Sequence, residues 1–323
     1  MEVPRSESIK NFIETHRETL EHARALFYSN DYETFVTLKP VLQELRDQYA
    51  TENSVAEDEM GASFPLQIFD SIIGRSYVTE QEASFVALPE ERGLYLPHES
   101  LGGGDYWATE PQGNDLGEVT LLDMASHGAE TLYPKALLTR MIQLYKKEPH
   151  GEGQPHLFAA IDAFLDDLPI PFQQMDHMEG RIIERDNKKY LTVELSGNVH
   201  LFIRDHSTGA VQYADTFQTQ SEVVSPIIVD RYPQLGAGLA KTLPRNIQPI
   251  PLPEHATVYF ATDGLFSLKS HDTKFIDAFT YFCETHRTLS ADAFREELFR
   301  LIRDIKTYDA GDDDVTVLLL ETR

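Results

Sequence analysis

The sequence lacks several features that would place a protein in a well-defined class. Cys283 is the only cysteine in 323 residues, so no disulfide can form within the chain. No apolar run approaches the roughly 20 residues that a membrane-spanning helix needs. The first residues also lack the charged and then apolar pattern of a secretory signal. We therefore expect a cytoplasmic protein that does not bind membranes.

Basic residues are scarce as well. Lys and Arg total 28 against 53 Asp and Glu, which gives a formal net charge of -25. Nucleic acids and anionic membrane surfaces are bound through cationic side chains that neutralise phosphates. The charge therefore argues against nucleic acid as a partner. The hydrophobic fraction of 41% is ample for a core.

The N-terminal part of the sequence predicts a helical hairpin. Apolar residues fall at helical spacing over residues 7–28 and again over residues 32–49. Asp31 is suited to cap the second helix, and Pro40 is expected to kink or divide it. The acidic residues 51–59 that follow predict a loop or linker.

These observations divide the chain into two parts. We expect residues 1–62 to form an N-terminal helical segment and residues 63–323 to form the main domain. An amphipathic hairpin shows only that something covers its apolar face. Packing onto the main domain is one interpretation, and dimerisation between two copies or regulation is the other.

The main domain alternates between short strands and longer helices. Alternating apolar residues predict strands, and apolar residues spaced by three or four predict helices. We expect strands at residues 85–88, 94–96, 119–122, 181–184, 190–195, 198–204, 211–214, 258–262 and 314–321, and helices at residues 66–73, 129–147, 157–165, 274–286 and 290–306. This pattern is typical of an α/β protein.

Acidic residues stand at the ends of four predicted strands. Asp105 follows a glycine run, Asp123 and Asp263 each end an apolar run, and the triplet at residues 312–314 opens directly onto the last strand. One such Asp is usually only a turn signal. Carboxylates gathered at the ends of packed strands repel one another unless a cation lies among them. Oxygen ligands without a cysteine set favour magnesium or manganese over zinc.

Four blocks of residues around these acids resemble a known family. They are residues 103–106 (GGDY), 123–128 (DMASHG), 262–264 (TDG) and 313–316 (DDVT). Their order and spacing resemble the metal-dependent protein phosphatase superfamily (PPM, protein phosphatase 2C-like), and more narrowly the bacterial branch named after stage II sporulation protein E (SpoIIE). The resemblance covers about residues 84–322. It implies an α-β-β-α sandwich of two mainly antiparallel sheets flanked by helices.

The resemblance also implies a site for two Mn2+ or Mg2+ ions. Asp123 would bridge the ions with the backbone carbonyl of Met124 nearby, and Asp105 and Asp263 would complete the ligand shells. Two hard cations held in this way can bind a phosphate oxygen and activate a water molecule that attacks phosphorus, so no protein nucleophile is needed.

Two further parts of the site follow from the same blocks. Asp313 matches the ligand position because it lies three residues before Thr316, whereas Asp312 and Asp314 would support the site or bind a third ion. His127 is a candidate general acid or water-orienting group, with a structural role at the helix start as the alternative.

One segment departs from the resembled branch. Residues 213–217 (YADTF) stand where that branch has a turn similar to Asn-Ala-Gly-His, which changes the loop expected on the substrate side. This departure keeps a second function open, namely a catalytically weak adaptor or signalling scaffold with the phosphatase fold.

The resemblance implies a manganese- or magnesium-dependent serine/threonine phosphoprotein phosphatase in bacterial signalling, such as sigma-factor partner switching. Its substrate would be a phosphorylated protein, for example an anti-sigma-antagonist domain of the STAS type. Residues 312–316 also fit the Asp-x-Asp-x-Thr pattern of haloacid-dehalogenase phosphatases, but that chemistry needs the strand before the aspartates. A calcium-binding module would need an Asp-x-Asp-x-Asp-Gly loop, which the sequence lacks.

Overall fold

A computed structural model shows two compact units in the chain. The first comprises Met1–Ala83, Gly128–Gln174 and Leu235–Thr242, and the second comprises Ser84–His127, Met175–Gln234 and Leu243–Arg323. The structure describes residues 5–54, 63–97, 103–112, 116–124, 129–148, 157–165, 175–214, 223–226, 231–232, 249–270, 273–308 and 313–322. The division of the chain between residues 62 and 63 stays a prediction.

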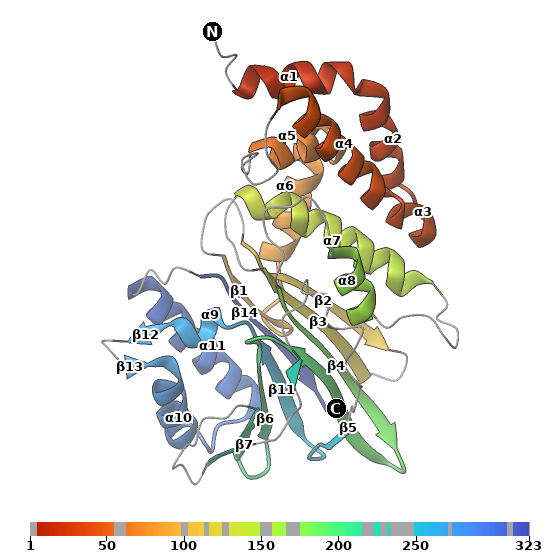
Figure 1. The fold of residues 1–323 in the computed structure, drawn as a ribbon. Helices are drawn as coiled ribbons and strands as arrows, with labels where there is room; N and C mark the ends of the chain where they lie inside the picture. Colours follow the sequence, from red (N-terminus) through yellow and green to blue (C-terminus); the bar gives the residue numbers. More distant parts are fainter. Residues whose placement is uncertain are drawn as a thin grey trace. The chain divides into compact units, whose positions relative to one another are not determined.

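The first unit is helical wherever the structure describes it. Its helices are α1 (Arg5–Thr15), α2 (Arg17–Phe27), α3 (Tyr32–Val36), α4 (Leu38–Asn53), α5 (Ser63–Ile72), most of α6 (Arg75–Val86), α7 (Ala129–Lys147) and α8 (Leu157–Leu165) (Figure 1). Aromatic rings hold distant helices together, since Phe35 stacks on Phe164 with centroids 5.6 Å apart. Tyr49 stacks in the same way on Phe64 at 4.1 Å. The predictions of α7 and α8 are confirmed.

The N-terminal helices are more divided than their apolar spacing predicts. The single helix expected over residues 7–28 was wrong, because α1 and α2 meet at a break at His16. The His16 ring lies against Phe12, with centroids 4.1 Å apart, and its Nε2 atom lies 2.8 Å from Glu52 Oε1. His16 lies outside the helical conformation, with φ −99° and ψ 26°, and the apolar periodicity does not indicate this break.

The second predicted helix is also two helices, α3 and α4. Asp31 caps α3 as predicted, since its side chain accepts a hydrogen bond of 2.7 Å from the backbone N–H of Thr34. Pro40 lies in the first turn of α4, which begins at Leu38. A proline is tolerated there because the first N–H groups of a helix have no partner within it. The break therefore falls at Thr37 rather than at the proline.

The second unit is built on two mainly antiparallel sheets, which confirms the predicted α/β fold class. One sheet has the strand order β1-β14-β11-β6-β7-β8, and the other has the order β10-β5-β4-β3-β2 with β9 also paired to β5. The strands are β1 (Gly93–Leu96), β2 (Tyr106–Gln112), β3 (Leu116–Met124), β4 (Met175–Arg185), β5 (Lys188–Ser196), β6 (His200–Asp205), β7 (Val211–Tyr213), β8 (Val224–Pro226), β9 (Arg231–Tyr232), β10 (Ile250–Pro251), β11 (Ala256–Ala261) and β14 (Val315–Glu321).

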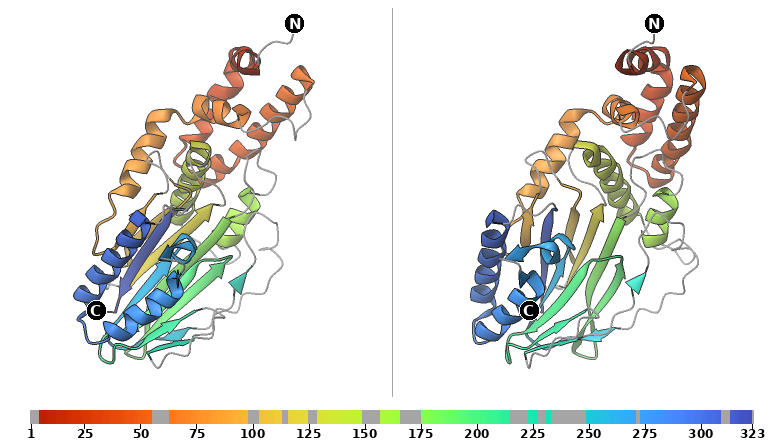
Figure 2. Two further views of the ribbon diagram at one scale, coloured as in Figure 1. Left: turned by 90° about the vertical axis from the view of Figure 1, so that its left-hand side faces the viewer. Right: turned by 60° about the vertical axis from the view of Figure 1, so that its left-hand side comes forward.

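The two sheets lie face to face over an apolar core (Figure 2). Alternate residues of each strand point into this core, as the two-residue period of a strand requires. Gly180 marks a close approach, because a Cβ atom there would lie 2.3 Å from the ring of Phe260 on the other sheet. Inward-facing residues include Val119, Leu121, Met178, Ile203, Val258, Phe260 and Leu318.

Helices cover the outer face of the β1–β8 sheet. The neighbours of the inward residues, such as Phe202 and Tyr259, pack against α10 (Phe275–Thr285) and α11 (Ala291–Tyr308). The short helix α9 (Gly264–Ser267) and the hairpin of β12 (Lys269–Ser270) and β13 (Thr273–Lys274) complete the described unit. No helix among the described residues is both long and apolar enough to cross a membrane.

One predicted strand was wrong. Residues 85–88 begin with the end of α6 rather than a strand. Phe85 packs edge-on against Tyr106 and Trp107, at centroid distances of 5.4 and 5.9 Å. Of the apolar residues that suggested a strand, Phe85 is buried at the helix end, whereas Val86 is 54% exposed. The neighbouring prediction at residues 94–96 is confirmed by β1.

Candidate metal centre

Three adjacent strands carry an aspartate at the same end of the β10–β2 sheet. Tyr106 on β2 pairs with Leu122 on β3, so Asp105, just before β2, lies beside Asp123. On the next strand, Asp176 of β4 is the direct partner of Asp123. The antiparallel register therefore brings together carboxylates that are up to 71 positions apart in sequence (176 − 105 = 71).

The other sheet supplies further acids from the ends of β11 and β14. The Thr262 N–H donates a hydrogen bond of 3.1 Å to the Thr316 carbonyl, which aligns the two strand ends. Asp263 follows at the start of α9, and its side chain makes no capping hydrogen bond. Carboxylate oxygens of Asp123, Asp176 and Asp263 all lie within 4.8 Å of one another, so these three residues could hold a metal ion.

Asp105 is oriented by two threonines of the facing sheet. Thr316 Oγ1 and Thr262 Oγ1 donate hydrogen bonds of 2.6 and 3.0 Å to Asp105 Oδ2. The residue is only 1% exposed, and no described residue donates a hydrogen bond to its other oxygen, Oδ1. A buried carboxylate oxygen without a partner is costly. Such an atom, within a set of hard oxygen donors, fits a site for a divalent cation.

Burial and mutual repulsion disfavour the charged forms of these acids. Burial is the largest cause that raises the pKa of Asp105 well above its ordinary value, followed by the charge of Asp314. Burial also raises the pKa of Asp123, followed by the charges of Asp105 and Asp263. A bound cation inverts this effect because it stabilises carboxylates in the ionised form. The residues present therefore fit the predicted manganese or magnesium ions.

Asp313 and Asp314 have different environments. Asp314 is 1% exposed and accepts a hydrogen bond from the Gly104 backbone N–H, which anchors the loop that carries Asp105. A Cβ atom at Gly103 would lie 2.1 Å from Asp314 Oδ1, so only glycine fits there. Asp313 is half-buried, and its Oδ1 accepts a hydrogen bond of 2.9 Å from the Asp314 N–H. Their assignment as metal ligands stays a prediction.

The remaining predicted site residues are only partly within the described structure. Met124 ends β3 beside Asp123 and is 1% exposed, so its backbone is close to the acids as expected. His127, Asp312 and residues 215–217 of the expected substrate loop lie outside the described residues. Their roles stay predictions.

Asp176 is the site residue that sequence reasoning missed. The predicted strand here began only at residue 181, whereas β4 begins at Met175. Asp176 has no glycine beside it and belongs to none of the four sequence blocks. Asp176 reaches the site because the register of β4 against β3 pairs it with Asp123.

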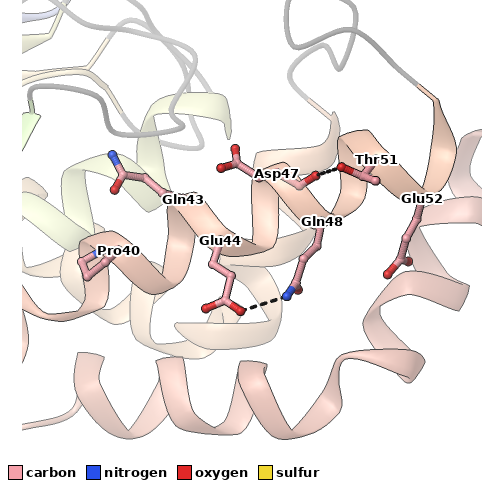
Figure 3. Close-up of a pocket in the computed structure, with 7 residues that line it drawn as sticks. All are labelled: Pro40, Gln43, Glu44, Asp47, Gln48, Thr51 and Glu52. Atoms are coloured by element: carbon pink, nitrogen blue, oxygen red, sulfur yellow. Dashed lines mark hydrogen bonds between the residues drawn. The ribbon is translucent and has the colours of Figure 1, made fainter.

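A second group of acids lines a surface groove of about 500 Å³ in the first unit (Figure 3). All its lining residues belong to α4, and they are Pro40, Gln43, Glu44, Asp47, Gln48, Thr51 and Glu52. Local hydrogen bonds engage several of them, such as the 2.9 Å bond that Gln48 donates to Glu44. A groove along one side of a single helix offers no convergent set of catalytic groups, so the acids of the second unit remain the candidate site.

Comparisons with known proteins show which proteins the chain resembles. The family model described as Stage II sporulation protein E (SpoIIE) matches residues 123–323, more than half of the chain. The SiaA-PP2C domain of Pseudomonas aeruginosa is similar in structure, with a TM-score of 0.52 and 19% identity over 80% of this chain and 95% of that chain. The RsbU and RsbW domains of Rv1364c from Mycobacterium tuberculosis also match, with a TM-score of 0.52 and 15% identity over 71% of this chain and 60% of that chain. No curated protein matches the sequence.

Proposed function

Because the chain belongs to the stage II sporulation protein E (SpoIIE) family, we propose that it is a protein phosphatase that hydrolyses phosphoserine or phosphothreonine with two Mn2+ or Mg2+ ions. The observation that carries this proposal is the group of buried and half-buried acids at the sheet ends. Carboxylate oxygens of Asp123, Asp176 and Asp263 lie within 4.8 Å of one another. Asp105 lies beside Asp123, and its buried Oδ1 has no hydrogen-bond partner among the described residues. Structures with the same fold include a domain named as PP2C.

We propose roles for the residues from the family resemblance together with their positions. Asp105, Asp123, Asp263 and Asp313 would hold the ions, with the Met124 carbonyl beside Asp123. When bound, such ions stabilise negative charge on phosphate oxygens and lower the pKa of a bound water.

Two threonines keep this arrangement rigid. The hydroxyls of Thr262 and Thr316 both donate to Asp105, so both are engaged in orienting a carboxylate. This arrangement supports attack by water rather than by a side chain of the protein.

The substrate that we propose is a phosphorylated protein of a bacterial signalling pathway. One structurally similar protein carries RsbU and RsbW domains, which supports a role in partner switching and a small STAS-type domain as the phosphoprotein. The amphipathic helices of the first unit would mediate dimerisation or regulation. We place the protein in the cytoplasm on the basis of its single cysteine.

Hydrolysis of an aryl phosphate tests the proposal. The purified chain is assayed with manganese and with a chelator, beside Asp263→Asn. Asp277→Asn is the matched control, because it makes the same change at an exposed position on α10 of the same unit. We expect manganese-dependent turnover that falls at least about 100-fold in Asp263→Asn and is unchanged in Asp277→Asn.

Two results would contradict the proposal. Equal turnover by the parent chain and by Asp263→Asn would show that the reaction does not take place at these acids. A folded chain that neither binds manganese nor releases phosphate would leave the scaffold function in place of the enzyme.

A further inference from the structure

Asp176 and Asp123 place two carboxylates side by side at one end of the β10–β2 sheet. They are direct partners on the antiparallel strands β4 and β3, so their side chains lie on the same face of the sheet. Like charges directly opposite each other destabilise a sheet, and burial increases the cost because water no longer screens the charges. Asp176 is 4% exposed and Asp123 is 9% exposed. A pair of this kind indicates a function rather than a contribution to folding.

The backbone around Asp176 is shaped to hold its carboxylate in place. The Asn198 N–H, in the turn between β5 and β6, donates a hydrogen bond of 2.8 Å to Asp176 Oδ2. Gly197 in the same turn has a φ of +73°, and a Cβ atom there would lie 1.7 Å from Asp176 Oδ1. The turn therefore fixes one carboxylate oxygen and leaves room for the other.

We infer that Asp176 is a further metal ligand, which binds a divalent cation together with Asp123 and Asp263. The mutual approach of the three carboxylates, within 4.8 Å, suits oxygen ligands of one ion. The buried Oδ1 atom of Asp105, without a hydrogen-bond partner among the described residues, is an independent sign that this end of the unit is built around positive charge. The inference rests on the proposed function, since it adds a carboxylate to the same centre.

A purely structural role for Asp176 makes a different prediction. If the carboxylate served only to accept the Asn198 hydrogen bond, an amide would replace it without loss, because its oxygen accepts the same N–H. The neutral amide is a much weaker ligand for a hard cation than a carboxylate. Asp176→Asn therefore separates the two roles.

The test measures manganese binding by isothermal titration calorimetry and thermal unfolding without metal, on the full chain. The variants are Asp176→Asn and the matched control Asp186→Asn. Asp186 is exposed in the turn after β4, at the opposite end of that strand, and has a φ of +52°, which asparagine also tolerates. Both variants remove one negative charge.

We expect Asp176→Asn to weaken at least one manganese-binding event about 10- to 100-fold. Its unfolding temperature in the absence of metal should be no lower than that of the parent chain. Asp186→Asn should bind manganese as the parent chain does. If Asp176→Asn fails to fold, Asp176→Ser provides the comparison, because it removes the carboxylate and leaves a small polar side chain.

The possible failures are distinguishable. Unchanged manganese affinity in Asp176→Asn, with binding by the parent chain and loss of binding in Asp123→Asn, would overturn the inference and leave the proposed function intact. A parent chain that binds no manganese would overturn both.

Discussion

The chain carries two groups of acids that differ in their surroundings more than in their number. Along α4, Glu44, Asp47 and Glu52 line an open groove, and the side chain of Asp47 is 61% exposed. At the sheet ends of the second unit, Asp105 and Asp123 are both buried, and the charge of Asp105 raises the pKa of Asp123. Burial and convergence of the acids, rather than acidity alone, therefore identify the site.

Solvent explains the difference. On α4 water screens each carboxylate, and surface ion pairs such as that of Asp47 with Arg46 contribute little. At the sheet ends the acids are buried from water and lie near other carboxylates. Both conditions raise the pKa of Asp105 and of Asp123. Only the second arrangement creates a strong preference for a cation.

The largest effect should come from removing a central carboxylate. We expect Asp123→Asn to lower manganese-dependent turnover by at least about 100-fold, because this residue lies next to Asp105, Asp176 and Asp263. Glu44→Gln, an acid-to-amide change on α4, should leave turnover unchanged. Phosphate release from a phosphopeptide measures the turnover of both variants. Equal losses of turnover in the two variants would mean that the two groups of acids do not differ in function.

A smaller but specific effect is expected at Gly197. Gly197→Ala strains a φ of +73° and also drives a Cβ atom into Asp176 Oδ1, whereas Gly74→Ala strains a φ of +83° with no atom within 4 Å. Both should lose about 1–2 kcal/mol of unfolding free energy from the strain. Only Gly197→Ala should also bind manganese more weakly, as measured by calorimetry. Similar affinity in both variants would mean that the turn does not position Asp176.

The threonine that orients Asp105 should matter next. Thr316→Val removes the 2.6 Å hydrogen bond to Asp105 Oδ2, and we expect about tenfold weaker manganese binding. Thr192→Val on β5 removes only a 3.2 Å bond to the Arg181 carbonyl at a partly exposed position, and it is the matched control. If the two variants bind manganese with equal affinity, the Thr316 hydroxyl is not needed to orient Asp105 for metal binding.

The smallest effect concerns pH and the metal-free chain. Asp105 and Asp123 bind protons more tightly when folded than when unfolded, because their pKa values are raised in the folded state. Their contribution to stability is therefore complete below the ordinary Asp pKa of about 4 and is lost as the pH rises through the raised values. Asp123→Asn should unfold at a higher temperature than the parent chain near neutral pH without metal, and the difference should shrink in acid. Calorimetric scans of both proteins measure this difference, and a constant difference across pH would contradict it.

Local patterns predicted much of the fold. Residues 129–147 and 157–165 form helices with the predicted bounds, because each segment carries its own apolar periodicity. The break at His16 interrupts a segment whose apolar spacing continues on both sides, and there the ring contacts Phe12 and the distant Glu52. Predictions thus failed where the apolar spacing did not mark the end of a helix.

The candidate site shows the same limit to what local sequence patterns can predict. Asp105, Asp123 and Asp263 could be selected from sequence because each belongs to a block with glycine or a strand end nearby. Asp176 could not, since its place depends on the register of β4 against β3. The engagement of Thr262 and Thr316 with Asp105 likewise depends on how two sheets meet.

The decisive experiment is release of phosphate from a phosphoserine peptide, with manganese and after its removal by a chelator. We expect turnover by the parent chain that requires manganese, is restored when the metal is returned, and is lost in Asp123→Asn. Turnover that persists in the chelated protein or in Asp123→Asn would show that the buried acids do not carry the chemistry.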